Sequence, residues 1–349
     1  MTKQRLHHFD VIKGIAIILV VMGHVLIMGI HNIDRAFLFK FIGTLHMPLF
    51  FFISGYFSYK FIEGKIAYPN MLNRFKQLIV PFFFVSMLWI YYFPHSGIES
   101  PLISSWQGLY SDSSKNGYWF TLCLFEMMLI FLSLIPIFNR VKNTILQVLI
   151  IGVIYFLINI FIQYGNEDIS NYLSLPLMII YLPIFFIGIF AQKHKQLFED
   201  SLKNNAFFTT SIIIGSLAIY YTCYFWEFPQ LPSFITNLIT TISHLSVVII
   251  AFTVIKPWCE KAYATNKPSF AIRALQYIGK ESLSIYLLHY FFLFPMTAFR
   301  QPMIDMGLGF TPLFVVSIIT SVIIITMVLG VKSIIERSKL LSLLLLGKG

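Results

Sequence analysis

Two polar side chains interrupt the first strongly apolar stretch of the chain, and their spacing places them on one helix face. Lys13 and His24 stand eleven positions apart within residues 9–25. Eleven steps of about 100° return nearly to the same face, roughly 16 Å farther along the axis. An imidazole at this depth needs a hydrogen-bond partner, and it either makes an interhelical structural bond or takes part in a reaction. The pair predicts a cation near one membrane surface and an imidazole near mid-membrane.

Glu126 is the carboxylate that we expect at a similar depth. It stands eight residues into an apolar stretch that begins at Tyr118, or about 12 Å below the surface where that stretch enters. A carboxylate there can hold an imidazole in one tautomer and stabilise its protonated form, as the third member of a hydrolase triad does. A protonated glutamate that donates one structural hydrogen bond explains the residue equally well.

The remaining polar residues near the membrane have structural explanations beside functional ones. Asp10 can cap the first helix and contact Lys13 one turn later. Arg74 and Lys76 precede an apolar stretch, where basic residues commonly determine topology. His289 is expected in the inner half of the membrane, below His24. Supporting or substrate-binding roles are predicted for Asp10, His46, Ser54, Trp119, Tyr286 and His289, whereas His244 belongs to a polar helix face of the kind that joins helices.

The elements that must position these side chains are membrane-spanning helices. Of the 349 residues 57% are hydrophobic and 11% are charged, a composition that no soluble domain can bury. We expect an all-α polytopic membrane protein, a single domain over residues 1–349, with about ten spans. They are predicted at residues 11–30, 45–62, 78–93, 118–138, 144–163, 172–191, 206–224, 233–256, 282–299 and 310–331.

The distribution of basic residues predicts the orientation of these spans. With both termini in the cytoplasm, the outward loops hold four of the 25 Lys and Arg residues. The net charge of +10 is therefore a topology signal, and a nucleic-acid partner is not expected. The three cysteines have no metal-ligand or redox spacing, so neither a metal site nor a disulfide framework is predicted. The outward basic residues are Arg35, Lys40, Lys115 and Arg300.

Five stretches, taken in order, resemble the acyltransferase-3 family of polytopic membrane enzymes. The first, "DVIKGIAIILVVMGH", has a basic residue, ten further residues and a histidine, and Asp10 and Gly14 also match the family pattern. With lysine in place of the commoner arginine, and with the stretch "HMPLFFFISGY", the sequence most resembles the fucose 4-O-acetylase-like branch of this family. The other four stretches are "FIGTLHMPLFFFISGYF", Arg74 before "LIVPF", "YWFTLCLF" and "IGKESLSIYLLH".

This resemblance implies transfer of an acyl group, usually acetyl, from cytoplasmic acyl-CoA to a sugar hydroxyl of a surface polysaccharide or lipid-linked glycan. His24 would act as base or acyl carrier, supported by Glu126. Lys13, Arg74 and Lys76 would bind the phosphates of acyl-CoA, which is the donor substrate and not a permanently bound cofactor. The expected location is the bacterial cytoplasmic membrane. The bare membrane module is expected, without an extra soluble domain.

Two other classes of protein fit part of the pattern. A polytopic solute transporter would use a histidine and a carboxylate for proton coupling, but no inverted repeat or paired broken helices are visible. A non-catalytic partner in polysaccharide export also remains open. The sequence does not decide which glycan is the acceptor or which acyl group is transferred. It also does not decide whether His24 is a base or a covalent carrier, or whether the protein forms a homo-oligomer.

Overall fold

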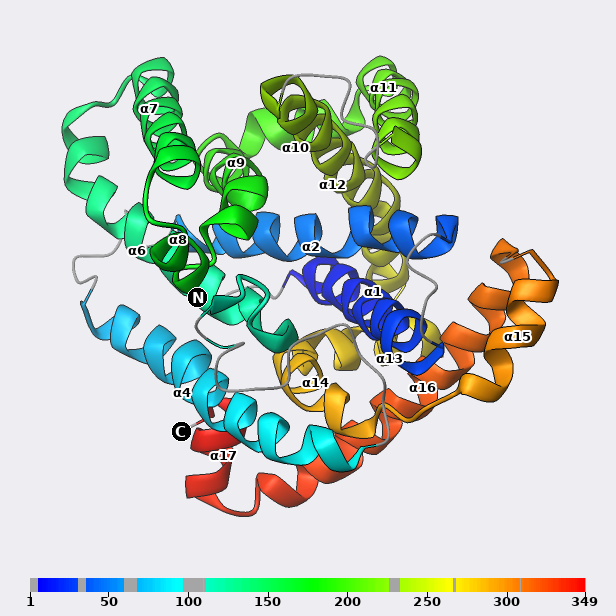
Figure 1. The fold of residues 1–349 in the computed structure, drawn as a ribbon. Coiled ribbons are helices and arrows are strands. Elements are labelled where there is room, and N and C mark those ends of the chain that lie inside the picture. Colours follow the sequence, from blue (N-terminus) through cyan, green and yellow to red (C-terminus); the bar gives the residue numbers. More distant parts are fainter. Residues whose placement is uncertain are drawn as a thin grey trace. The chain divides into compact units, whose positions relative to one another are not determined.

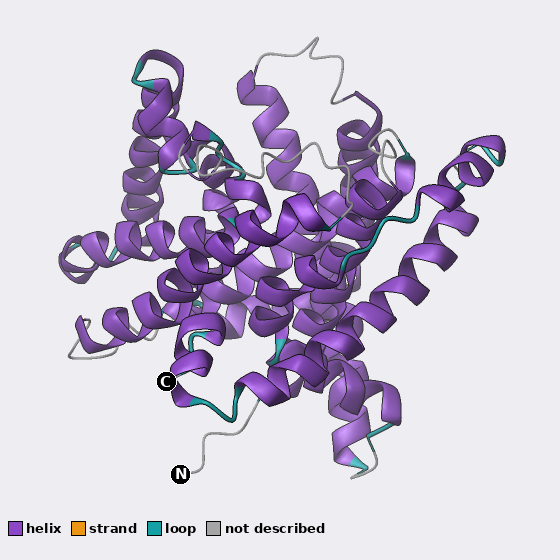
Figure 2. Cartoon of the chain, turned by 60° about the horizontal axis from the view of Figure 1, so that its bottom comes forward, coloured by secondary structure: helices purple, strands orange, loops and turns teal. Residues whose placement is uncertain are grey.

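All regular structure in the described part of the chain is helical (Figure 2). The computed structural model describes residues 6–30, 36–59, 68–96, 109, 111–225, 233–265, 268–307 and 309–348. Arg35, which was counted among the outward basic residues, lies outside them.

Nine helices in the described ranges are long and apolar enough to cross a membrane. They confirm the all-helical, polytopic membrane class. Their bounds are α1 (His7–His24, continued by the π-helix η1, Val25–Ile30), α2 (Phe37–Ser58), α4 (Tyr68–Tyr92), α6 (Trp119–Arg140), α7 (Thr144–Tyr164), α9 (Leu175–Lys193), α11 (Asn205–Phe225), α12 (Ser233–Ala264) and α16 (Phe310–Ile335).

The tenth predicted span, residues 282–299, forms a shorter structure. Its apolar helix covers Ser282–Phe292 and consists of α14 (Ser282–Leu288) and the 3₁₀ turn η4 (His289–Phe292). Eleven residues reach only about 16 Å, roughly half of a membrane. The chain then becomes extended at Leu293. Pro295 follows two residues later, and the ring of a proline disfavours the helical conformation in the residue before it, here Phe294. His289 and Tyr290 consequently lie in a tight turn and not in a continuous span.

Several shorter helices occupy stretches that the hydropathy pattern assigned to connections. The most consequential is α13 (Phe270–Lys280), whose first turn is capped by the Ser269 hydroxyl, which accepts from the backbone N–H of Ile272. The others are α8 (Glu167–Tyr172), α10 (Lys195–Lys203), α15 (Thr297–Asp305), α17 (Lys339–Leu346), η2 (Phe93–His95) and η3 (Lys115–Gly117).

The chain divides into two compact units, and each is described by itself. The boundaries fall inside α2, after Ile53, and inside α16, after Lys332. The first unit comprises residues 1–53, 97–100 and 194–332, and the second comprises residues 54–96, 101–193 and 333–349.

In the first unit, α1 packs along α13 with direct backbone contact (Figure 1). Two glycines make this approach possible. A Cβ atom at Gly14 would stand 2.1 Å from the carbonyl oxygen of Leu275, and one at Gly279 would stand 1.8 Å from the carbonyl oxygen of Asp10. Only Glu281 separates α13 from α14, so the contact between α1 and α13 also determines where α14 begins relative to α1.

In the second unit, α9 contacts both α6 and α7, and α4 contacts α6 and α17. Gly55 serves a close approach here too, because a Cβ at that position would stand 1.9 Å from the carbonyl oxygen of Phe185. Helix α7 differs from its neighbours in burying only Gln147 and Ile151. Most of its surface is therefore apolar and exposed, as lipid contact requires.

Candidate functional site

His24 is the last α-helical residue of α1. Directly after it the helix widens into the π-helix η1, Val25–Ile30. Such widened turns inside helices are rare and often occur at functional sites. The imidazole of His24 is half-buried, while most of α1 around it is buried.

Both ring nitrogens of His24 bind side chains that follow α14. Nδ1 lies 2.9 Å from Nε2 of His289, and Nε2 lies 2.9 Å from the hydroxyl of Tyr290. The rings pack closely, with the His24 centroid 4.9 Å from that of His289 and 4.7 Å from that of Tyr290. His289 is fully buried, and so is Tyr290.

The positions of the protons follow from the partners of His289. Its Nδ1 lies 2.7 Å from the carbonyl oxygen of Tyr286 and 3.0 Å from that of Ile285. Since carbonyl oxygens only accept, Nδ1 carries the proton, and Nε2 of the neutral ring is an acceptor. The bond between the two rings is then donated by Nδ1–H of His24.

This assignment leaves a lone pair on Nε2 of His24, which accepts the hydroxyl proton of Tyr290. His289 thus fixes the tautomer of His24, and Tyr290 marks the direction in which Nε2 can take a proton. An imidazole held in this way is suited to act as a general base or a nucleophile.

The segment after η4 is joined to the widened end of α1. The backbone N–H of Met296 donates to the carbonyl oxygen of Gly29 over 2.8 Å. The side chain of Met296 also packs against Gly29. A Cβ atom added to Gly29 would stand 3.2 Å from the terminal methyl carbon of Met296. The π-helix that follows His24 and the extended chain that follows Tyr290 therefore support each other.

His46 and His244 belong to the same unit and extend the group of histidines. Nδ1–H of His46 donates to the carbonyl oxygen of Ile42 over 2.7 Å, which leaves its Nε2 as an acceptor. His46 interacts electrostatically with both His24 and His244. Among the described residues, no three histidine, cysteine or acidic side chains are placed to hold a metal ion.

Lys13 makes the contact with Asp10 that its spacing predicted. Its ammonium lies 2.9 Å from Oδ1 of Asp10, one turn earlier on α1. The lysine side chain is 26% exposed and the aspartate side chain 11% exposed, so the cation remains open to solvent more than its partner does. Both side chains lie on the helix that also carries His24.

Glu126 lies in the second unit, within α6, and its predicted role beside His24 stays a prediction. One carboxylate oxygen, Oε2, is buried without a hydrogen-bond partner among the described residues. The carboxylate interacts electrostatically with Lys115, which is fully buried in η3. The Lys115 ammonium donates to the carbonyl oxygen of Asp112 over 3.0 Å and to that of Asn171 over 2.6 Å. Burial lowers the pKa of Lys115 to about 8, although the nearby carboxylates oppose this shift.

Four other predicted residues also lie in the second unit. Arg74 is half-buried and donates to Oε1 of Gln77 over 3.0 Å, whereas Lys76 is exposed. The carbonyl of Ser54 accepts from the hydroxyl of Ser58. Trp119 is half-buried and stacks on Tyr181, with the ring centroids 5.6 Å apart. Binding roles for these residues remain predictions.

The structure brings together two residues that the sequence placed at different depths, and it adds a third. His289 was expected below His24, yet the two rings are hydrogen-bonded because α14 ends in the turn η4. Tyr290 was not among the predicted site residues. One feature of the sequence could have indicated Tyr290. It directly follows His289 within an apolar stretch, where a tyrosine hydroxyl needs a hydrogen-bond partner. The three cysteines, Cys123, Cys223 and Cys259, are buried and free.

In comparisons with known proteins, one family model matches most of the chain. The family model described as an acyltransferase domain matches residues 6–329. Nodulation protein NolL of Mesorhizobium japonicum is 33% identical over 161 residues, which cover 44% of this chain and 42% of that protein. Nodulation protein NolL of Sinorhizobium fredii is 34% identical over 147 residues, covering 40% and 38%. The chain thus spans about two fifths of the length of these curated relatives. No solved structure matches the chain significantly.

Proposed function

Because this chain belongs to the acyltransferase-3 family of membrane acyltransferases, we propose that it transfers an acyl group, usually acetyl, from acyl-CoA to a sugar hydroxyl. The acceptor is a surface polysaccharide or a lipid-linked glycan, as the resemblance to the fucose 4-O-acetylase-like branch implies. The observation that carries this proposal is the arrangement around His24 at the end of α1. His289 accepts a hydrogen bond from Nδ1–H of His24, and this leaves the lone pair of Nε2 available to take a proton.

The proposed reaction uses this lone pair directly. The sugar oxygen attacks the carbonyl carbon of the thioester while Nε2 of His24 takes the hydroxyl proton. The carbon–sulfur bond then breaks, and the thiolate of coenzyme A receives the proton from the imidazolium. In the covalent alternative, Nε2 attacks the thioester carbon first and the thiolate of coenzyme A leaves. The sugar oxygen then attacks the acyl carbon, the bond from that carbon to Nε2 breaks, and the hydroxyl proton passes to the thiolate. His289 supports both routes, because its Nε2 accepts from Nδ1–H of His24 and thereby stabilises the imidazole when it becomes positively charged.

We propose that the donor enters from the cytoplasm and the acceptor from outside, with both termini in the cytoplasm of a bacterial cell. The distribution of basic residues supports this orientation. Lys13, Arg74 and Lys76 are the proposed phosphate-binding residues for acyl-CoA. Glu126 is proposed to support the charged imidazole, and Lys115 is the cation with which this carboxylate interacts.

Replacing Tyr290 with Phe is expected to lower kcat by about fivefold and to leave the KM for acyl-CoA within about twofold. The ring remains, but the hydroxyl that aligns the lone pair of His24 is lost, and one such bond contributes about 1 kcal/mol. Release of coenzyme A under saturating donor measures the effect. Tyr263→Phe is the matched control, because it removes a hydroxyl that donates to Gln276 instead. A kcat for Tyr290→Phe equal to that of the control would rule out the proposed alignment.

The proposed function is tested by comparing surface glycans of wild-type and deletion cells by mass spectrometry. We expect the polymer to remain and its acyl groups to disappear, and the mass difference identifies the acyl group. Loss of the whole polymer would instead favour an assembly partner. The purified protein should also release coenzyme A from acetyl-CoA when a glycan extract is added. Transport of a solute without any release of coenzyme A would favour the transporter.

A further inference from the structure

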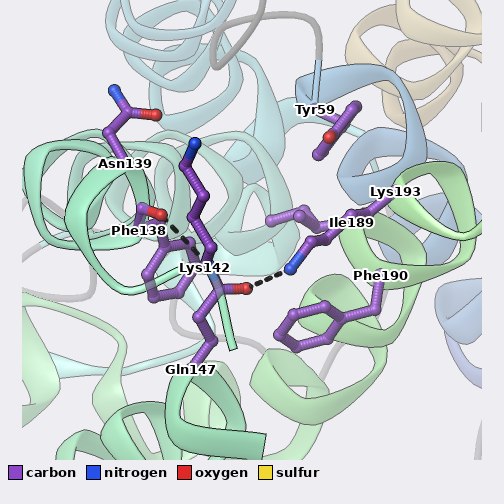
Figure 3. A pocket seen from close by; sticks show the side chains of 8 residues that line it. All are labelled: Tyr59, Phe138, Asn139, Lys142, Gln147, Ile189, Phe190 and Lys193. Carbon is purple, nitrogen blue, oxygen red and sulfur yellow. Dashed lines mark hydrogen bonds between the residues drawn. The ribbon is translucent and has the colours of Figure 1, made fainter. Parts of the chain in front are cut away.

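A basic pocket lies in the second unit, and none of the residues to which the reaction was assigned lines it (Figure 3). It is formed where α6 ends at Arg140, α7 begins at Thr144 and α9 ends at Lys193. Its volume is about 260 Å³. The lining residues are Tyr59, Phe138, Asn139, Lys142, Gln147, Ile189, Phe190 and Lys193.

One of its two ammonium groups is held in place by neutral partners. Nζ of Lys193 donates to Oε1 of Gln147 over 2.7 Å and to Oγ1 of Thr144 over 2.9 Å. Gln147, which is only 3% exposed, is itself fixed, because Nε2 donates to the carbonyl oxygens of Val141 and Phe138. These interactions orient the cation of Lys193 without neutralising it.

The second cation is Lys142, whose exposed side chain lies at the same pocket (Figure 3). Among the described residues, no carboxylate lines the pocket, and no ion pair involves Lys142 or Lys193. The amide of Asn139 and the hydroxyl of Tyr59 supply further polar groups. Two ammonium groups and neutral donors around a small cavity suit a phosphate group.

The surroundings of the pocket indicate where the phosphate comes from. Helix α7 turns Gln147 toward the pocket and exposes apolar side chains over the rest of its surface in the same turns: Leu146 and Val148, on either side of Gln147, are each 50% exposed, and Leu149 is 58% exposed. A cavity of this size is below the range of about 300 to 1,000 Å³ that encloses a drug-sized ligand, so it suits a headgroup whose remaining atoms lie outside. Basic pockets between membrane helices are known to bind anionic lipid headgroups.

We propose that this pocket binds the phosphate of an anionic phospholipid, with the acyl chains lying along the exposed face of α7. The cation of Lys193 is fixed by Gln147 and Thr144, and Lys142 supplies the second positive charge. The site is independent of the proposed transfer reaction and of His24. A soluble phosphate compound, such as coenzyme A, carries the same chemical group and is the alternative source.

The test is retention of lipid by the purified full-length protein, measured by native mass spectrometry. The protein is offered equal amounts of phosphatidylglycerol and phosphatidylcholine with identical acyl chains. We expect wild-type protein to retain phosphatidylglycerol preferentially. Lys142→Glu should reduce this preference by about tenfold or more, because one of the two positive charges at the pocket becomes a negative charge that repels phosphate.

Arg140→Glu is the matched control, because Arg140 is an exposed basic residue two positions earlier that does not line the pocket. It should change the preference by no more than about threefold. Equal losses in the two variants, or no preference in wild-type protein, would overturn the lipid site. A second arm measures binding of inorganic phosphate in neutral nanodiscs, because coenzyme A would also bind at the proposed donor site. Binding that Lys142→Glu abolishes and Arg140→Glu preserves, without a lipid preference, would keep the phosphate pocket and assign it to a soluble compound.

Discussion

Replacing His24 with Gln or with Asn is expected to lower the rate of acyl transfer by about a thousandfold or more. The amide of either side chain can form hydrogen bonds, but it cannot take a proton at neutral pH or carry an acyl group. Asn retains a donor near the position of Nδ1, which binds His289, and Gln retains a polar group near that of Nε2, which binds Tyr290. Loss of activity in both variants would therefore report the chemistry of the imidazole and not a lost contact. Coenzyme A release with saturating donor and acceptor is the measurement.

The control for this experiment is His95→Asn. His95 also forms a hydrogen bond through Nδ1, to the backbone carbonyl of Tyr91, but it is exposed and lies in the other unit. It should retain full activity. Elution volume in size-exclusion chromatography and the Tm of each variant establish that the proteins are folded. Activity within tenfold of wild type in both His24 variants would exclude His24 as base and as carrier.

The sequence predicted the membrane helices well because hydrocarbon imposes a minimum length and an apolar composition on each span. Nine of the predicted segments correspond to long apolar helices. Residues 282–299 differ, since hydropathy measures apolarity and takes no account of backbone geometry. The segment is apolar throughout, but Pro295 and the turn at His289 end the helix early.

The site could be predicted only in part, because its contacts join residues far apart in the chain. The spacing of Lys13 and His24 was visible, and so was their place in the family signature. The bond between His24 and His289 joins positions 265 residues apart, and no local pattern predicts such a contact. The amphipathic α13 was also missed, although it sets the path from α12 to α14. Its length of 11 residues is too short for a span, so hydropathy treated it as a connection.

Gly14→Ala and Gly279→Ala are each expected to destabilise the protein by about 1–3 kcal/mol or more, and to lower its Tm by several degrees. A methyl group at either position would meet a backbone carbonyl oxygen, that of Leu275 or that of Asp10, at about half of a normal contact distance. Backbone of this kind cannot turn aside as a flexible side chain can, so α1 and α13 must separate. Thermal unfolding of the purified variants in one detergent measures the loss.

Gly43→Ala is the matched control, because Gly43 lies within α2 of the same unit and no atom of the described residues stands within 4 Å of the added carbon, apart from the helix's own backbone. Alanine favours helix over glycine by about 1 kcal/mol, so this variant should have an unchanged or higher Tm. Separation of α1 from α13 also shifts α14, and a bond of 2.9 Å between His24 and His289 does not survive a shift of an ångström. Activity per folded molecule should therefore fall in Gly14→Ala and Gly279→Ala and persist in Gly43→Ala. Full activity and an unchanged Tm in the first two would show that the contact of α1 with α13 does not set the geometry of the histidine pair.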